Sequence, residues 1–405
     1  MIQLQSEPLV RVGIIEASRV RYIYKGVERV VEHSEAFEAV YLPDGPFTLC
    51  DVTIGKQFHW EQQEDQTFVG ALRIIADGSQ LFAINEVPLE DYLASVISSE
   101  MAATNNIELL KAHAIISRSW VMRQLQGSTT GNQSATAQTL DSQASEGEMI
   151  KWWDHDDHQL YDVCADDHCQ RYQGVTRQVS PLVAEAIRLT RGMVLLDSDG
   201  EVCDARFYKA CGGHTERFSA CWQERDYHYL QPTADPYCAP EFIAQLPGGL
   251  DGVMQLVLNS YDRSTIDYHD WTEHFTSEEL SELVARKLQL DLGRILQLEP
   301  LERGDSGRII RLRIVGTERT IVIGKELLIR KALSESHLKS SWFDVTPHYV
   351  PDSQHPVGFT LYGHGWGHGV GLCQIGAAAM SLAGFSHEDI LAHYYNAARI
   401  IRLYD

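Results

Sequence analysis

A change of hydrophobic pattern near residue 88 constrains the fold of this chain more than any other sequence feature. Residues 9–86 contain short runs rich in β-branched residues, separated by turn signals such as PDGP and ADGS, which is the pattern of β-strands. Residues 88–125 instead repeat apolar side chains at helical spacing. Pro88 suits a first helical turn, and Asn105 with Glu108 resembles a capping box that opens a second helix. The sequence therefore predicts a β region followed by two consecutive helices.

The C-terminal half mixes strands and helices without a regular order. Thr276 and Glu279 form a second capping-box pattern, and residues 307–324 alternate as in a β-hairpin. Residues 374–405 predict two helices separated at Gly384 and a short final strand. Because strands and helices do not alternate regularly, we expect an α+β fold with irregular mixed sheets and two or three subdomains, rather than a doubly wound sheet.

The predicted organisation has five parts. One of them is a loop, because residues 127–148 are small, polar and non-periodic. This composition indicates a flexible segment, either a surface insertion or a flap over a site. The parts are 9–125, the β region with the two helices; 126–150, the polar loop; 151–240, a Cys/His-rich segment; 241–300, a helical insertion or protruding subdomain; and 301–405, a C-terminal part.

Composition excludes some partners. The 405 residues are 44% hydrophobic and 22% charged, and 56 acidic against 34 basic residues give a formal net charge of −22. Such a surface repels phosphate backbones and anionic lipid, so we expect no nucleic-acid partner. No apolar run is long enough for a membrane span, and no secretory signal is visible at the N-terminus.

The segment LASVISSEMAA places a carboxylate in an apolar stripe. The stripe is formed by Leu93, Val96, Ile97 and Met101. Glu100 occupies a position where the pattern asks for an apolar residue. Burial disfavours the ionised form of a carboxyl group, and a carboxyl that keeps its proton can act as a general acid. Alternatively, Glu100 pairs with a buried cation, for which Arg118 on the next helix is the obvious candidate, or lies at the edge of the stripe.

The segment GHGWGHGVG, residues 363–371, has glycine at every second position. If it is extended, one face carries no side chains and admits another backbone or a ligand, whereas the other presents His364, Trp366 and His368. A tryptophan flanked by imidazoles suits a sugar ring. The alternative is a glycine-rich turn whose histidines satisfy buried backbone groups.

Two further segments concentrate metal-binding or nucleophilic side chains. The stretch HDDHQLYDVCADDHC offers a four-ligand set that would close a tetrahedral zinc site with a structural role: His158, Cys164, His168 and Cys169. His155 is an alternative to His158, and exposed histidines with reduced or paired cysteines remain an alternative to a metal site. In YKACGGHTE, Cys211 could be a nucleophile and Glu216 a second carboxylate, although a Gly-Gly turn is the commoner reason for such a stretch.

Several of these stretches, taken in order, resemble one family. The blocks NEVPLEDYLASVISSEMAATNNIELLKAHAIISRSWVMR, ACGGHTE, LERGDSGRIIRLRIVG, ELLIRKAL and GHGWGHGVGLCQIGAAAMSLAGFSHEDILAHYY resemble the sporulation stage II protein D and amidase enhancer family, SpoIID/LytB. The resemblance extends over nearly the whole chain and is weakest at 127–160 and 240–275.

The resemblance implies lytic transglycosylase activity on peptidoglycan glycan strands stripped of their stem peptides. It implies that Glu100, in the position of the family's catalytic glutamate, protonates the glycosidic oxygen and then deprotonates the C6 hydroxyl of the same MurNAc, which closes a 1,6-anhydro ring. It also implies structural zinc on the four His/Cys ligands, a cell-wall amidase as a possible partner, and action in the cell envelope, although without a visible signal peptide a cytoplasmic location stays open. Candidate substrate contacts are Arg118, His214, His364, Trp366, His368 and Gln374.

Two other functions compete with the enzyme. A non-catalytic module that binds glycan and enhances an amidase would need the sugar-binding groove and no titrating carboxylate. A zinc-dependent hydrolase would need a metal with an open coordination position, held by His364, His368 and His214 or by the Cys/His segment.

Overall fold

The N-terminal region is built from two sheets that share one core. The computed structural model describes residues 4–34, 36–55, 61–101, 106–129, 147–152, 158–166, 168–176, 180–258 and 268–405. The N-terminal strands are β1 (Leu9–Ala17), β2 (Arg19–Tyr24), β3 (Val27–Glu32), β4 (Val40–Leu42), β5 (Phe47–Ile54), β6 (Gln62–Phe68), β7 (Ala71–Asp77) and β8 (Gln80–Pro88). One sheet has the order β10-β1-β8-β7-β4, in which β10 is the later strand Val163–Cys164, and the other has the order β3-β2-β5-β6. The prediction of a β region before residue 88 is confirmed.

Two consecutive helices follow these sheets, as predicted. Helix α1 spans Leu89–Glu100 and α2 spans Ile107–Thr129. The cap of α2 lies one residue later than predicted, because the Asn106 side chain accepts hydrogen bonds from the backbone N–H groups of Glu108 and Leu109 at 3.1 and 3.3 Å. Asn105 lies outside the described residues. Helix α2 also continues into the predicted polar loop, most of which, 130–146, lies outside the described residues.

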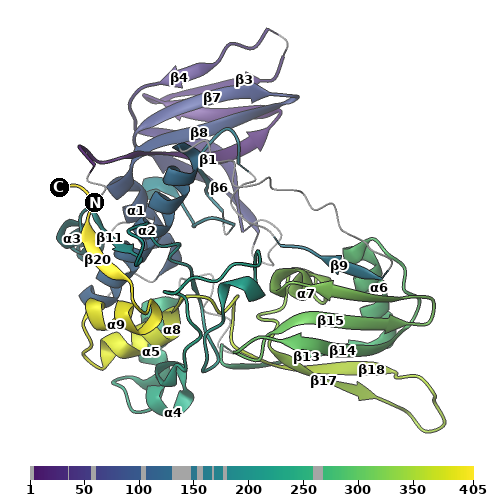
Figure 1. Cartoon of the computed structure of the whole chain (residues 1–405). Coiled ribbons are helices and arrows are strands. Elements are labelled where there is room, and N and C mark those ends of the chain that lie inside the picture. Colours follow the sequence, from purple (N-terminus) through teal and green to yellow (C-terminus); the bar gives the residue numbers. More distant parts are fainter. Residues whose placement is uncertain are drawn as a thin grey trace.

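The helices form a layer beside the N-terminal sheets, and the C-terminus returns to this layer (Figure 1). Its other elements are α3 (Pro181–Leu189), β11 (Met193–Leu196), α4 (Pro240–Ile243), α5 (Gly249–Val257), α8 (Gln374–Leu382), α9 (His387–Tyr394) and β20 (Arg399–Arg402). Strand β20 pairs antiparallel with β11. The two predicted C-terminal helices and the final strand are confirmed.

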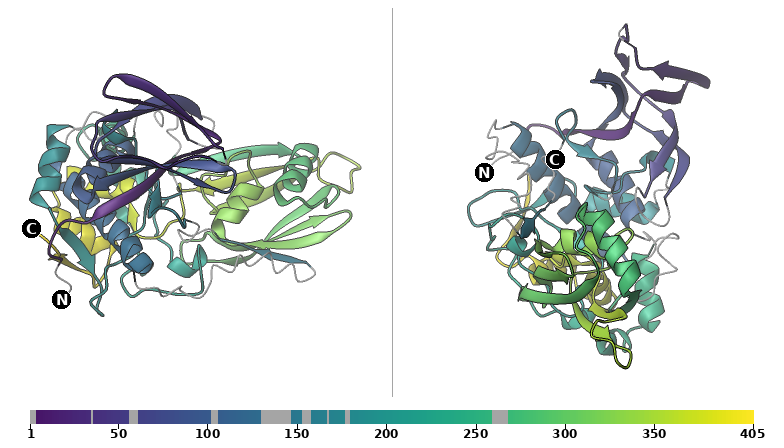
Figure 2. Two further views of the ribbon diagram at one scale, coloured as in Figure 1. Left: turned by 90° about the horizontal axis from the view of Figure 1, so that it is seen from above. Right: turned by 90° about the vertical axis from the view of Figure 1, so that its right-hand side faces the viewer.

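A separate lobe extends to the right in Figure 1 and is seen from two other sides in Figure 2. It contains β9 (Glu148–Ile150), β13 (Asp270–Thr276), α6 (Ser277–Leu288), β14 (Ile295–Arg303), β15 (Ile309–Gly316), β16 (Thr320–Gly324), α7 (Glu326–Ala332), β17 (Phe343–His348) and β18 (Gly358–His364). Its sheets have the orders β14-β15-β16-β9 and β13-β18-β17, and its apolar residues form their own core. The predicted hairpin corresponds to β15 and β16, and the predicted capping box of Thr276 and Glu279 is present at α6.

The architecture is α+β, as the irregular order of elements predicted. Three hydrophobic clusters correspond to the N-terminal sheets with α1, the helical layer, and the lobe. Among the described residues, no helix is long and apolar enough to cross a membrane.

Candidate active site and metal centre

Glu100 is the last residue of α1, at the boundary between core and surface. The four stripe residues Leu93, Val96, Ile97 and Met101 are all 0% exposed, so the predicted apolar face is confirmed, whereas Glu100 is partly buried. The backbone N–H of Arg171 donates a hydrogen bond of 2.9 Å to Glu100 Oε1. One oxygen of the carboxylate is therefore held by a segment 71 residues later in the chain.

That segment lies along α1 and is fixed to it by several contacts. Tyr92 donates a hydrogen bond of 3.2 Å from its hydroxyl to Gln170 Oε1, and the ring of Tyr172 stacks on that of Tyr92 with centroids 5.1 Å apart. The N–H of Gln173 donates to Ser95 Oγ at 3.0 Å. Residues 170–173 are thus positioned by the helix that carries Glu100.

Arg118 pairs with Glu90 rather than with Glu100, for which it was the candidate partner in the alternative interpretation. Its guanidinium is 0% exposed and pairs with Glu90, with Nη2 2.6 Å from Oε2 and Nε 3.0 Å from Oε1. Tyr404 also donates a hydrogen bond to this carboxylate. Burial raises the pKa of Glu90, but the charge and hydrogen bonds of Arg118 outweigh it and lower that pKa. Arg118 therefore has a structural role at the start of α1, which is inconsistent with direct contact to a substrate.

The four predicted zinc ligands come together beside the same segment. We call His158, Cys164, His168 and Cys169 the His/Cys cluster. Cys164 ends β10 (Val163–Cys164), which pairs parallel with β1. The ligand atoms of the cluster lie within 4.8 Å of one another, and Cys169 Sγ is 3.4 Å from His158 Nε2 and 3.6 Å from His168 Nδ1.

This geometry fits zinc. Tetrahedral zinc with its usual bond lengths places neighbouring sulfur and nitrogen ligands about 3.6 Å apart. Hydrogen bonds from Cys169, His158 and His168 lower the pKa of the Cys164 thiol, and the thiolate is the form that binds metal. Four protein ligands fill a tetrahedral shell, which indicates a structural site. The alternative ligand His155 lies outside the described residues.

The glycine-rich segment is wound and not extended. It leaves β18 at His364, and four alternate glycines then have positive φ angles of 70°, 103°, 89° and 81°: Gly365, Gly367, Gly369 and Gly371. The bare positions do admit another backbone. A Cβ at residue 365 would lie 2.8 Å from the carbonyl oxygen of Ala210. Ala210 and Trp366 form an isolated antiparallel β-bridge at this point.

The two histidines of this segment have different surroundings. His368 donates from Nε2 to the Phe207 carbonyl oxygen at 3.1 Å and accepts at Nδ1 from the Val370 N–H at 3.0 Å. Burial lowers its pKa well below the usual range. It is therefore a neutral histidine that satisfies backbone groups, which was the alternative interpretation. His364 is 38% exposed, pairs with Asp270 at 2.5 Å and lies against the Trp342 ring, so it remains accessible to a ligand.

The remaining candidates lie in the helical layer. His214 binds the carbonyl oxygen of Thr215, and Gln374 is buried with its amide nitrogen 3.5 Å from His113 Nε2. Glu216 is 1% exposed and accepts hydrogen bonds from backbone N–H groups of the lobe at residues 305 and 306. Its role is structural, which does not support a second catalytic carboxylate. Cys211 is 0% exposed and bonds to Asp235 rather than to a histidine, which does not support a nucleophilic role.

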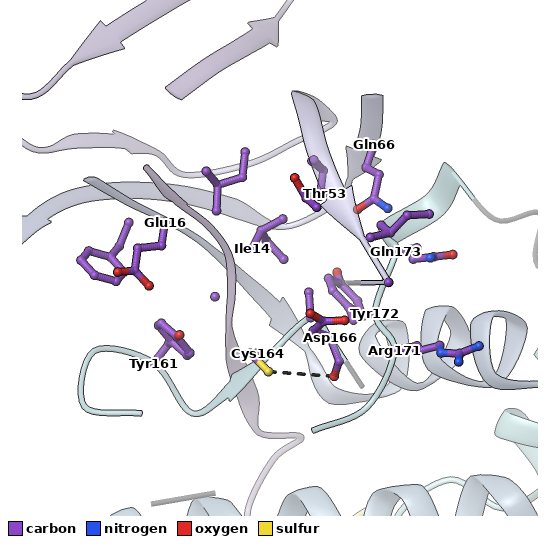
Figure 3. Close-up of a pocket in the computed structure, with 17 residues that line it drawn as sticks. Ile14, Glu16, Thr53, Gln66, Tyr161, Cys164, Asp166, Arg171, Tyr172 and Gln173 are labelled. Atoms are coloured by element: carbon purple, nitrogen blue, oxygen red, sulfur yellow. Dashed lines mark hydrogen bonds between the residues drawn. The ribbon is translucent and has the colours of Figure 1, made fainter. Parts of the chain in front are cut away.

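A pocket of about 60 Å³ adjoins the His/Cys cluster (Figure 3). It lies between β1, β5 and the segment that contacts α1, and Cys164, Asp166 and Arg171 line it. The pocket is far smaller than the roughly 300 Å³ of typical ligand sites. The contact between Arg171 and Glu100 was not predicted from the sequence, because it is made by a backbone N–H group and does not depend on the type of side chain.

Comparisons with known proteins relate two regions of the chain to known families. Residues 77–196 match the family model SpoIID, described as Stage II sporulation protein. This chain carries a SpoIID domain. The domain contains Glu100, Arg171 and the whole His/Cys cluster, and its match supports a cell-wall-related function. Residues 216–371, which include most of the lobe, match a domain of unknown function, DUF8618.

Curated relatives are similar over most of the chain. Stage II sporulation protein D of Bacillus subtilis (strain 168) is 24% identical over 322 residues, covering 78% of this chain and 76% of the relative. The protein of the same name from Bacillus amyloliquefaciens is 23% identical over 78% of this chain and 75% of its own. An uncharacterized protein of Brachyspira hyodysenteriae is 23% identical over 82% of this chain and 72% of its own.

Proposed function

We propose that this protein is a peptidoglycan lytic transglycosylase that cleaves the MurNAc–GlcNAc bond of peptide-stripped glycan strands in the cell envelope. The observation that carries the proposal is the position of Glu100. It ends a helix of the SpoIID domain, is partly buried, and has one carboxylate oxygen held at 2.9 Å by the Arg171 N–H. Acid and base catalysis requires a carboxyl group held in a fixed position, and this contact supports that role for Glu100.

One carboxyl group suffices for this reaction. Glu100 gives its proton to the glycosidic oxygen as the bond to MurNAc C1 breaks. It then takes the proton of the C6 hydroxyl as that oxygen bonds to C1. The carboxyl group is restored, no water is consumed, and the product has a 1,6-anhydro end. Ordinary glycosidases need a second carboxylate for water or for a covalent intermediate, whereas here the sugar supplies the nucleophile.

The His/Cys cluster supports this site without taking part in the chemistry. When zinc is bound, it supplies a cross-link between β10 and the neighbouring loop. Cys169 directly precedes the residues that contact α1, among them Arg171, whose N–H holds Glu100. The cluster thereby fixes the backbone donor of the catalytic carboxylate. This arrangement favours a structural metal and argues against the zinc-dependent hydrolase.

The test is the substitution Glu100→Gln. It keeps the shape of the side chain and removes proton transfer, so we expect the release of anhydro products from peptide-free glycan strands to fall by about 10² to 10⁴. Glu185→Gln is a matched control, because Glu185 is an exposed glutamate paired with Arg188 on α3, and it should leave the rate unchanged. Mass spectrometry of the products measures both.

Other outcomes would select other functions. Undiminished formation of anhydro ends by Glu100→Gln would contradict the proposal. Binding to purified sacculi with no product from the unaltered protein would favour the non-catalytic amidase enhancer. Hydrolytic products with free reducing ends, lost on metal removal from folded protein, would favour the zinc-dependent hydrolase.

A further inference from the structure

A second group of metal-binding side chains lies in the core of the helical layer, outside the residues that match the SpoIID model. We call Cys211, Asp235, Cys238 and Cys373 the Cys/Asp cluster. Cys211 follows β12 (Phe207–Tyr208), Asp235 caps and Cys238 ends the single helical turn Pro236–Cys238, and Cys373 caps α8. All four are 0% exposed, and their ligand atoms lie within 4.8 Å of one another. All eight cysteines of the chain are free thiols in the structure.

Backbone N–H groups surround the sulfur atoms. Gly213 donates to Cys211 Sγ at 3.2 Å. Cys373 Sγ accepts from Cys211 at 3.3 Å and from Gly376, at the start of α8, also at 3.3 Å. Such hydrogen bonds stabilise thiolates, as does a helix N-terminus, so the chain supplies a polar environment suited to metal-bound sulfur.

Asp235 is a buried carboxylate whose surroundings orient it toward the cysteines. Oδ2 accepts hydrogen bonds from the Tyr394 hydroxyl at 2.9 Å and from Cys211 Sγ at 3.2 Å, and Oδ1 accepts from the Tyr237 N–H at 3.1 Å. The basic group nearest to it in the described part of the chain is His393, with Nε2 3.6 Å from Oδ1. Carboxylate oxygen is one of the ligands that zinc accepts, and Oδ2 lies within hydrogen-bond distance of a cysteine of the cluster.

Small residues keep the space for this arrangement. A Cβ on residue 376 would lie 2.4 Å from Asp235 Oδ2 and 2.2 Å from the Tyr394 hydroxyl. Gly212 and Gly213 have φ angles of 76° and 110°, conformations that turn the chain so that the Gly213 amide points back at Cys211 Sγ. The Gly-Gly pair, interpreted from sequence as an ordinary turn, forms part of the wall of the cluster.

We propose that the Cys/Asp cluster binds a structural zinc ion through three thiolates and one carboxylate. Tetrahedral zinc places sulfur and oxygen ligands about 3.6 Å apart, so the observed contacts need only small shifts. Thiolate ligands select zinc over hard cations such as Mg²⁺, and four protein ligands close the shell. The metal joins three segments: the loop after β12, the turn at Asp235, and the start of α8.

Zinc analysis of the full chain, purified from zinc-supplemented cultures, tests this proposal. We expect two zinc ions per chain, one in each cluster. The double variant C164S/C169S should keep one, and Cys373→Ser should lose one. Cys203→Ser is the matched control, because Cys203 is also 0% exposed in the same core but belongs to neither cluster, and it should keep both.

Two measurements keep the proposal open to refutation if Cys373→Ser does not fold. Asp235→Asn retains the size of the side chain and should lower zinc content by one. In C164S/C169S, cobalt in place of zinc should give the strong thiolate charge-transfer absorption of a tetrahedral sulfur site. A folded C164S/C169S chain without zinc, an unchanged zinc count in Asp235→Asn, or a disulfide among Cys211, Cys238 and Cys373 would overturn the proposal. None of these readouts depends on glycan cleavage.

Discussion

The two ligand clusters differ in how the chain builds them. The His/Cys cluster comes from twelve consecutive positions, 158–169, and its members are partly buried or exposed. The Cys/Asp cluster joins residues up to 162 positions apart and is completely buried. The first can open by movement of one loop, whereas the second can open only if the packing of the helical layer is lost. A local cluster therefore fixes a segment, and a dispersed cluster fixes the fold.

The largest expected consequence is a difference in the rate of metal release. We expect a chelator to remove zinc from the His/Cys cluster through local opening, and from the Cys/Asp cluster only through opening of the core. If the two openings differ by about 3 kcal/mol, the rates differ by more than a hundredfold. A chromogenic chelator would record two phases, and only the fast one should disappear in C164S/C169S. A single fast phase that releases both ions would remove the distinction between the clusters.

A second expected difference concerns activity. Cys164→Ser should lower the rate of glycan cleavage by about 10 to 100 times, because this cluster fixes the Arg171 N–H that holds Glu100. Loss of residues that orient the functional groups of a site typically lowers activity by this factor. The effect should be on kcat more than on KM, because Cys164 does not contact the sugar in our proposal. Steady-state rates on peptide-free glycan strands measure it, with Cys203→Ser as control. If kcat is unchanged although the metal is absent, the His/Cys cluster does not position the catalytic carboxylate.

The same contrast explains what could be predicted from the sequence. The strands before residue 88, α1 and α2, the capping box at Thr276 and the His/Cys cluster were predicted because each depends on residues close in the chain. The Cys/Asp cluster was not, because nothing near Cys211 indicates Cys373 as its neighbour. Likewise, the sequence named Arg118 as a candidate partner of Glu100 but could not show that it instead pairs with Glu90, near the other end of α1.

The glycine-rich segment shows a further limit of structure prediction from sequence. Alternation at residues 363–371 suggested an extended strand, and close backbone approach was correctly expected. The positive φ angles of Gly365, Gly367, Gly369 and Gly371 wind the segment instead, and sequence alone does not distinguish these conformations, because glycine permits both. As a consequence, His368 lies inward on backbone groups and His364 outward, although the pattern placed them on one face.

A third group of potential metal ligands differs from the two cysteine-containing clusters, and the prediction for it has the smallest expected effect. Glu108, His387 and Glu388 also bring their ligand atoms within 4.8 Å, but here the partners are ionic. Lys111 Nζ lies 2.7 Å from Glu108 Oε1, and His387 Nδ1 lies 2.6 Å from Oε2. Burial raises the pKa of Glu108, but hydrogen bonds from Lys111 and His387 outweigh it and lower that pKa from 4.5 to about 2. We therefore expect ion pairs and no metal at this group.

The corresponding prediction concerns the pH dependence of stability in Glu108→Gln. A carboxyl whose pKa is lower in the folded state stabilises the fold fully above its unfolded pKa, and this contribution is lost as pH falls from about 4.5 towards about 2. The group is partly exposed, so we expect the substitution to cost only about 1 kcal/mol at pH 7. Urea unfolding at pH 7 and pH 3 measures it: the difference from the unaltered protein should shrink at pH 3, with zinc content unchanged. A loss of zinc would mean that this group binds metal as the two cysteine-containing clusters are proposed to do, and a difference that grows in acid would contradict the lowered pKa of Glu108.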